Sequence, residues 1–263
     1  NALSQLLPTL DEALESSTDS NSRQGVCIAL HELIESSNVA VLIEFQEIIV
    51  SIIRKTLVDG DETVREAAAF AFDSFQTVIG KAAVDEVIPY LLNMLNSDDN
   101  SEYALLALQE IMATKSEIIF PILIPTLLAP PIDAFKARAL GSLAEVAGSA
   151  LFKRLSVIIS ALVDSLLNLN ADSEDRSEIA SALDKVFVSV KDDEGLHPLL
   201  QQILALTKHE DSSKRAVILE RLPYFFENTS LNYNIYTQDF VTQLILSLDE
   251  KDEEIVKNAF VSL

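Results

Sequence analysis

Residues 62–80 read ETVREAAAFAFDSFQTVIG. Apolar side chains recur every three or four positions along this stretch, which is the spacing of one face of an α-helix. Gly80 follows the last apolar position and indicates the end of the helix. Residues 82–95, AAVDEVIPYLLNML, repeat the apolar spacing, and the polar run NSDDN at 96–100 interrupts it. The stretch therefore predicts two helices joined by a turn.

The same two-helix unit recurs along the chain. Each first helix follows an acidic or Ser/Asn-rich turn and has a charged anchor residue near its start. The anchor residues are Arg23, Arg65, Glu102, Arg138, Arg176, Arg215 and Lys257. Successive anchors lie 36 to 42 residues apart, in or just below the period of about 40–47 residues that HEAT and armadillo repeats have. Ankyrin and TPR repeats are shorter, at about 33–34 residues.

This periodicity predicts an all-α fold, an α-solenoid of tandem HEAT repeats built from antiparallel helix pairs in a right-handed superhelix. We expect one array over residues 1–263. Its approximate repeats are 1–18 (a second helix only), 19–59, 60–97, 98–131, 132–171, 172–210, 211–249 and 250–263 (a first helix only). Because neither end carries a polar capping repeat, we expect the array to be an uncapped fragment of a longer one.

The expected second helices span 39–58, 82–95, 116–128, 149–169, 196–208 and 233–248. Several have a proline near the start, where the missing N–H of proline leaves no helical hydrogen bond unmade. Pro223 differs, because it lies well inside the first helix of the sixth complete repeat. We expect a kink or an early helix end there.

Composition supports the all-α prediction and limits the partners. Hydrophobic residues make up 49% of the chain but aromatic residues only 6%, and 6 Gly and 8 Pro are too few for a many-stranded β protein. The formal net charge of −22 repels phosphate backbones, so we expect little nucleic-acid binding. The single cysteine excludes an internal disulfide framework. No apolar run is long enough to span a bilayer, so we expect no membrane contact.

The sequence offers no catalytic or metal site. Its glycines are scattered singly, so no phosphate-binding loop is present. Cys27 and His31 lie four positions apart on one expected helix, but Cys27 flanks an apolar stripe and fits a small core residue better than a nucleophile. Acidic turns such as 59–62 lack the ligand positions of a calcium loop and fit the positive end of a helix dipole. We therefore expect no enzyme and no cofactor.

A basic cluster stands out on this acidic chain. Lys208, His209, Lys214, Arg215 and Arg221 fall within fourteen positions of the sequence. The anchor Arg215 has two possible roles: an ion pair with the acidic turn of a neighbouring repeat, or a bidentate contact to a carboxylate of a partner. With the anchor of the preceding repeat added, the predicted partner-binding residues are Arg215, Lys214, Arg221, Arg176 and Lys208.

Several turns also resemble a known family. The stretches SRQGVCI (22–28), ETVREAAA (62–69), ATKS (113–116), PTLLAPP (125–131) and SVKDD (189–193) are similar to the large HEAT-repeat activators of the general-control kinase. That kinase phosphorylates the alpha subunit of translation initiation factor two during amino-acid starvation. The resemblance covers most of the chain in order and is to a fungal version.

The resemblance implies a function that the periodicity alone does not give. In that family this segment binds the RWD domain at the N-terminus of the kinase. The whole protein works in the cytoplasm on translating ribosomes, together with an ATP-binding-cassette partner, and passes on the signal of uncharged tRNA. Two other interpretations remain open: a structural spacer without a partner of its own, and a generic transport or phosphatase scaffold.

Overall fold

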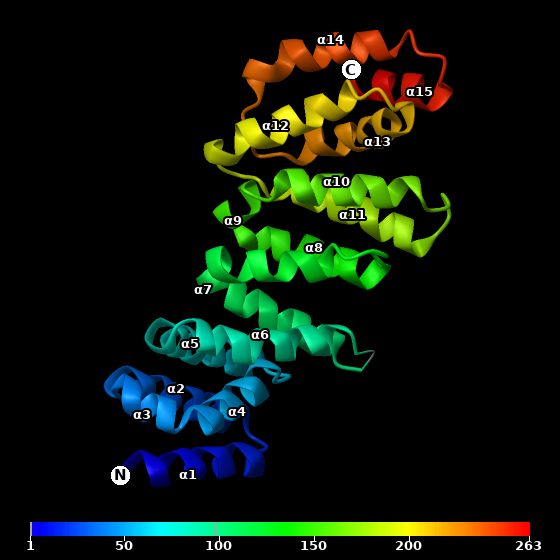
Figure 1. The fold of residues 1–263 in the computed structure, drawn as a ribbon. Helices are drawn as coiled ribbons and strands as arrows, with labels where there is room; N and C mark the ends of the chain where they lie inside the picture. Colours follow the sequence, from blue (N-terminus) through cyan, green and yellow to red (C-terminus); the bar gives the residue numbers. More distant parts are fainter. Residues whose placement is uncertain (1, 98) are drawn as a thin grey trace. The chain divides into compact units, whose positions relative to one another are not determined.

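A computed structural model describes residues 2–97 and 99–263; Asp98, in the expected turn 96–100, lies outside the described residues. Within them the regular elements are helices (Figure 1). They are α1 (Ala2–Ser16), α2 (Ser20–Ser36), α3 (Val39–Glu44), α4 (Gln46–Leu57), α5 (Glu62–Ile79), α6 (Lys81–Leu95), α7 (Ser101–Leu127), α8 (Ala134–Ala147), α9 (Ser149–Phe152), α10 (Leu155–Leu167), α11 (Glu174–Ser189), α12 (Asp193–Thr207), α13 (Ser212–Asn228), the 3₁₀ helix η1 (Asn234–Tyr236), α14 (Thr237–Ser247) and α15 (Glu253–Ser262). The predicted all-α fold is confirmed.

The helices form two compact units, an N-terminal unit of residues 1–115 and a C-terminal unit of residues 116–263. The division falls inside α7, where Lys115 has non-helical angles (φ −133°, ψ 37°). The sequence predicts the start of a second helix at Ser116, the next residue. The two halves of α7 are therefore the first and second helix of one expected repeat, joined without a loop.

Short acidic turns begin the first helices. Asp19, Asp61, Asp211 and Asp252 precede α2, α5, α13 and α15, and each accepts hydrogen bonds from backbone N–H groups of the first turn. Such caps satisfy donors that have no partner within the helix. The expected role of the acidic turns as helix starts is confirmed.

Small side chains let the first helices pack closely within each unit. In the N-terminal unit α5 packs against α2 and α4, and it buries alanines on several sides together with Phe72 and Phe75. In the C-terminal unit α8 packs against α11, with Gly141 facing Ala182 and Lys185. Apolar burial of this kind is the main stabilising contribution to a helical repeat.

Two of the expected glycine and helix boundaries are confirmed. The helix over 62–79 has those bounds, and Gly80 follows it with φ +74°, a conformation that costs glycine little. Gly148 makes the equivalent turn between α8 and α9 with φ +54°.

Three expected second helices are each broken in two. The range 39–58 divides into α3 and α4 at Phe45, 149–169 divides into α9 and α10, and 233–248 begins as η1 before α14. Apolar spacing continues across each break, so the sequence pattern does not predict the break. At the second break Phe152 turns inward against Gly195 of α12.

Of the kink or early helix end expected at Pro223, the early end is wrong. Helix α13 contains Pro223 and continues to Asn228, where Thr229 N–H donates to Phe225 O as the C-terminal cap. Proline removes the bond from its own nitrogen to the carbonyl four residues before it. Leu222 and Phe225 on either side are fully buried, so packing holds the helix through this point.

We expect opposite effects from two glycine-to-alanine substitutions. A Cβ at Gly195 would lie 2.7 Å from Phe152 Cε1 and still closer to Val190, so Gly195→Ala should lower the free energy of unfolding, by ~1–3 kcal/mol. Gly25 is exposed in α2 with open space around it, so Gly25→Ala should raise that free energy by ~0.5–1 kcal/mol. Urea unfolding followed by circular dichroism measures both, and a stabilised Gly195→Ala variant would contradict the packing.

Candidate partner-binding surface

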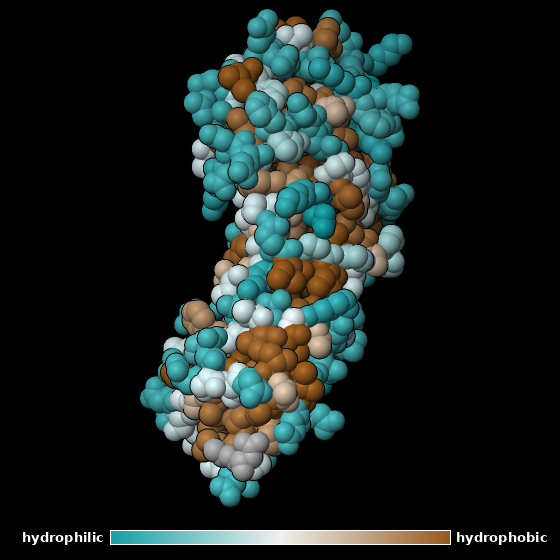
Figure 2. Space-filling view, turned by 60° about the vertical axis from the view of Figure 1, so that its left-hand side comes forward, coloured by the Kyte–Doolittle hydropathy of each residue, from teal (hydrophilic) through white to brown (hydrophobic). Residues whose placement is uncertain are grey.

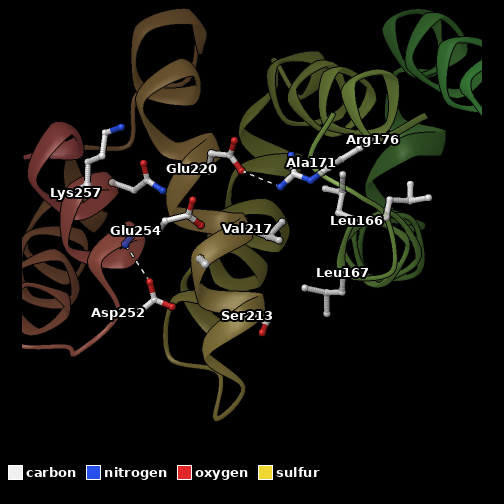
Figure 3. A pocket seen from close by; sticks show the side chains of 13 residues that line it. Leu166, Leu167, Ala171, Arg176, Ser213, Val217, Glu220, Asp252, Glu254 and Lys257 are labelled. Carbon is white, nitrogen blue, oxygen red and sulfur yellow. Dashed lines mark hydrogen bonds and ion pairs between the residues drawn. The ribbon is translucent and has the colours of Figure 1, made fainter. Parts of the chain in front are cut away.

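Two adjoining grooves lie on the first helices of the C-terminal unit. One is bounded by the end of α10 with the turn that follows it, by α13 and by α15. Figure 3 shows its lining side chains. The other runs between α11 and α13. Both grooves are lined by Ala171, Arg176 and Glu220, so they form one continuous surface, named here the α11–α13–α15 groove.

An alternating chain of ion pairs crosses this groove. Arg176 Nη2 lies 3.4 Å from Glu220 Oε2, and Glu220 Oε1 lies 3.1 Å from Arg221 Nη2. Arg221 Nη1 in turn lies 3.0 Å from Asp184 Oδ2. The first pair is long and partly exposed, whereas the last is mostly buried. The chain therefore weakens from the inner end at Asp184 to the outer end at Arg176.

Asp184 is the unusual member of the chain. Burial raises the pKa of its carboxyl to about 6, although the neighbouring Arg221 acts in the opposite direction. Its Oδ1 atom is buried and accepts no hydrogen bond from the residues that the structure describes. A carboxylate with one unsolvated oxygen favours the neutral form, which is why burial outweighs the arginine.

Arg215 is held by its own fold. Its Nε and Nη2 atoms bind the two carboxylate oxygens of Glu250 at 2.8 and 2.7 Å, and this pair raises the pKa of the guanidinium. Nη1 donates to the carbonyl oxygens of His209 and Glu210 at 2.6 and 3.0 Å. All three nitrogens of the guanidinium therefore have partners.

In the N-terminal unit two arginines share the two kinds of contact that Arg215 makes. Arg23 binds both carboxylate oxygens of Asp59, in the turn after the second helix of its repeat, as Arg215 binds Glu250. Arg65 donates to the carbonyl oxygens of Asp59 and Gly60, which lie six and five residues before it, as His209 and Glu210 lie before Arg215. Arg23, Arg65 and Arg215 thus bind acidic turns at the ends of repeats, contacts named here the ladder, and for Arg215 this is the first of the two roles that the sequence left open.

The other predicted residues are placed less uniformly. Lys214 Nζ lies 2.8 Å from Asp164 Oδ1 of α10, and Lys208 is exposed at the C-terminal end of α12. The structure brings Arg176 and Arg221 together but leaves Lys208, Lys214 and Arg215 outside the groove lining. It also adds Lys257 to the groove, an anchor that the sequence did not select as a contact. Their contact with a partner stays a prediction.

Cys27 lies in the core, as expected. Its side chain is fully buried, and burial raises the pKa of the thiol to about 11. His31 is occupied elsewhere, with Nδ1 2.8 Å from Ser74 Oγ. The described residues hold no group of three or more His, Cys, Asp or Glu side chains suited to a metal ion. None of their helices has the length and apolarity to cross a bilayer.

The ladder predicts the cost of removing Arg215. Arg215→Ala leaves Glu250 and two carbonyl groups without their donor, so we expect the free energy of unfolding to fall by ~1–3 kcal/mol. A double-mutant cycle with Glu250→Ala, measured by urea unfolding, isolates the pair. Lys208→Ala is the control and should change stability by less than about 0.5 kcal/mol; an equally small effect of Arg215→Ala would contradict the ladder.

Asp184 predicts a pH dependence of stability. Its folded pKa, about 6, lies above the ordinary 3.8, so its contribution is full below pH 3.8 and is lost as pH rises through about 6. Relative to Asp184→Asn, which cannot ionise, the wild type should lose up to ~3 kcal/mol over this window. Melting temperatures from pH 4 to 7 measure the difference. Asp164→Asn removes an exposed carboxylate and serves as the control. If the melting temperatures of the wild type and Asp184→Asn change with pH in parallel, the raised pKa of Asp184 is refuted.

The comparisons with known proteins agree with the predicted family. A family model described as "Stalled ribosome sensor GCN1-like, HEAT repeats" matches residues 119–263. The eIF-2-alpha kinase activator GCN1 of Saccharomyces cerevisiae is 61% identical over 263 residues, covering 100% of this chain and 10% of that protein. The stalled ribosome sensor GCN1 of Homo sapiens is 32% identical over 261 residues, covering 99% of this chain and 10% of that protein.

Among solved structures, Kap121p covers 98% of this chain with a TM-score of 0.45 and 14% identity, and this chain spans 29% of that structure. The chain spans about a tenth of the length of its curated relatives. The resemblance to a fungal kinase activator is confirmed by the relative from yeast. The chain belongs to the GCN1-like family of HEAT-repeat proteins.

Proposed function

We propose that this chain is a protein-binding segment of a GCN1-type activator, and that it holds the N-terminal RWD domain of the kinase that phosphorylates initiation factor two alpha. The observation that carries the proposal is the 61% identity, over the whole chain, to a protein named eIF-2-alpha kinase activator. The segment acts by recruitment and contributes no catalytic group or cofactor of its own.

The distribution of basic residues supports the C-terminal unit as the contact. Of the 19 Lys and Arg residues of the chain, 13 lie in residues 116–263 and 6 in residues 1–115. An acidic partner surface is attracted to basic side chains that keep some exposure. The proposed contact residues remain Arg176, Lys208, Lys214, Arg215 and Arg221, with Lys257 added from the groove.

The ion pairs of the groove suggest how a partner carboxylate would bind. Arg176 and Glu220 lie 3.4 Å apart, and their side chains are 24% and 39% exposed. A pair this long and exposed contributes little stability, so a carboxylate of the partner exchanges with Glu220 at small cost. Arg215 and Arg221 are more firmly held, by Glu250 and by Asp184 respectively.

The proposal also includes where the full-length protein works in the cell. The human relative is named a stalled ribosome sensor, which supports the placement of the full-length protein on translating ribosomes in the cytoplasm. In that setting, with an ATP-binding-cassette partner, it passes the signal of uncharged tRNA to the kinase. The acidity of this chain argues that other regions make most of the contacts to ribosomal RNA.

Isothermal titration of the 263-residue chain with the isolated RWD domain tests the recruitment. We expect one-to-one binding that weakens as salt rises, because the contact is between charges. The double variant Arg176→Gln/Lys257→Gln should bind at least about tenfold more weakly. Lys191→Gln, an exposed lysine in the turn between α11 and α12, is the matched control and should bind like the wild type.

Arg215→Ala is a poor probe of contact, since it also removes the ladder pair with Glu250. Circular dichroism melts should therefore accompany each variant. If the folded wild-type chain does not bind the RWD domain, the recruitment proposal fails and the structural spacer remains. If binding survives in the double variant, the RWD domain sits on another surface of the chain.

A further inference from the structure

A second surface, on the first helices of the N-terminal unit, is exposed and apolar. Ile28 of α2 and Phe70 of α5 are 50% and 57% exposed, and they line a hollow of about 310 Å³ between the two helices. Figure 2 shows hydrophobic atoms gathered over this unit, in the lower half of the view, with hydrophilic atoms around them. The Ile28–Phe70 hollow is a surface that the core does not use.

The exposure of Phe70 is out of place for its helix. Its neighbours Ala69 and Ala71 are buried, and Phe72 and Phe75 of the same helix are fully buried in the core. An exposed aromatic side chain does not contribute the stabilisation that a buried aromatic side chain provides. Exposed apolar patches with a polar rim are typical of interaction sites.

Glu66 is the acidic residue among those that line the hollow. Burial, with the charges of Glu66 and Glu62, raises the pKa of Glu110 of α7, so Glu66 stands among like charges. Arg65 donates to the carbonyl oxygens of Asp59 and Gly60, and its charge acts on Glu110 in the opposite direction without outweighing burial and the neighbouring glutamates. A cation brought by a partner would be favoured beside Glu66.

The basic side chains of this unit are not free to supply that cation. All six have partners within the unit: Arg23 with Asp59, Arg54 with Glu86, Lys55 with Asp11 and Glu15, Arg65 with two carbonyl oxygens, Lys81 with Asp85, and Lys115 with Asp73. Against them stand 19 acidic residues. Nucleic acids and anionic lipids are therefore repelled, and a second copy of this surface brings the same charges.

We propose that the Ile28–Phe70 hollow binds a basic amphipathic helix of a protein partner. One apolar side chain of that helix enters between Ile28 and Phe70, and a lysine or arginine about one turn away faces Glu66. Helix-in-groove binding of this kind is recognised by apolar residues at helical spacing. The surface is separate from the α11–α13–α15 groove and takes the opposite charge.

Two labelled synthetic peptides of identical Leu, Lys and Ala composition test the proposal. In one the leucines fall at helical spacing, and in the other the order is scrambled. Fluorescence anisotropy with the full 263-residue chain at physiological salt should give binding of the amphipathic peptide about tenfold tighter than the scrambled one. Phe70→Ser and Glu66→Gln should each remove most of that difference.

Matched variants in the C-terminal unit separate this site from general attraction of a cationic peptide to an acidic chain. Ile245→Ser replaces an exposed apolar residue of α14, and Glu227→Gln an exposed acid of α13, so both should bind like the wild type. Ile28→Gln gives an independent variant if Phe70→Ser lowers the melting temperature. Equal binding of the two peptides, or unchanged binding by Phe70→Ser, would overturn the proposal. So would a dimer of the free chain in analytical ultracentrifugation that Phe70→Ser dissociates.

Discussion

A helix such as α5 cannot be stable alone, because apolar and small residues occupy too much of its circumference. Val64, Ala68, Ala71, Phe72 and Phe75 are fully buried on one face of the helix, and Ala67 and Ala69 are buried on either side of that face. Burying them requires another helix on each side, and in a repeat protein the neighbouring hairpin supplies it. Turn positions, helix bounds and the exposed surface follow from this stacking.

Stacking concentrates the polar groups at the edges of the repeats. The turns that begin first helices carry aspartates that cap the helix, and Arg23, Arg65 and Arg215 bind the carboxylates or carbonyl oxygens of such turns. This gives the acidic composition a structural cause, since one or more carboxylates are used at each such turn. Charges beyond that requirement, such as Glu66 and Lys257, are left on the surface.

The two units offer different surfaces for recognition. The C-terminal unit has most of the basic residues and an open groove with a loosely held pair, Arg176 and Glu220. The N-terminal unit has neutralised its cations internally and exposes Ile28 and Phe70 beside surplus glutamates. The two proposed contacts, with partners of opposite charge, do not depend on each other, because each surface is made by neighbouring helices only.

Much of the fold could be predicted because its signals are local. The stripe at 62–79, the glycine stop at Gly80 and the acidic helix starts each depend on a few neighbouring residues. The break at Phe45 left no signal in the apolar spacing. The break after Phe152 and the continuous helix at Pro223 could not be predicted either, because they reflect packing against other parts of the chain. Of the candidate site, the sequence identified Arg176 and Arg221 but not the acids that hold them.

The sequence by itself determined an all-α repeat protein, its period, the family and a strongly acidic surface. Only the tertiary structure decided which charges face each other. Arg23 and Asp59 are 36 residues apart, and Arg215 and Glu250 are 35 apart, so each pair forms only after a whole repeat has folded back. Helical spacing depends on residues close together in the sequence. An ion pair between residues about one repeat apart depends on how the helices stack, and the sequence pattern does not give the distance between their side chains.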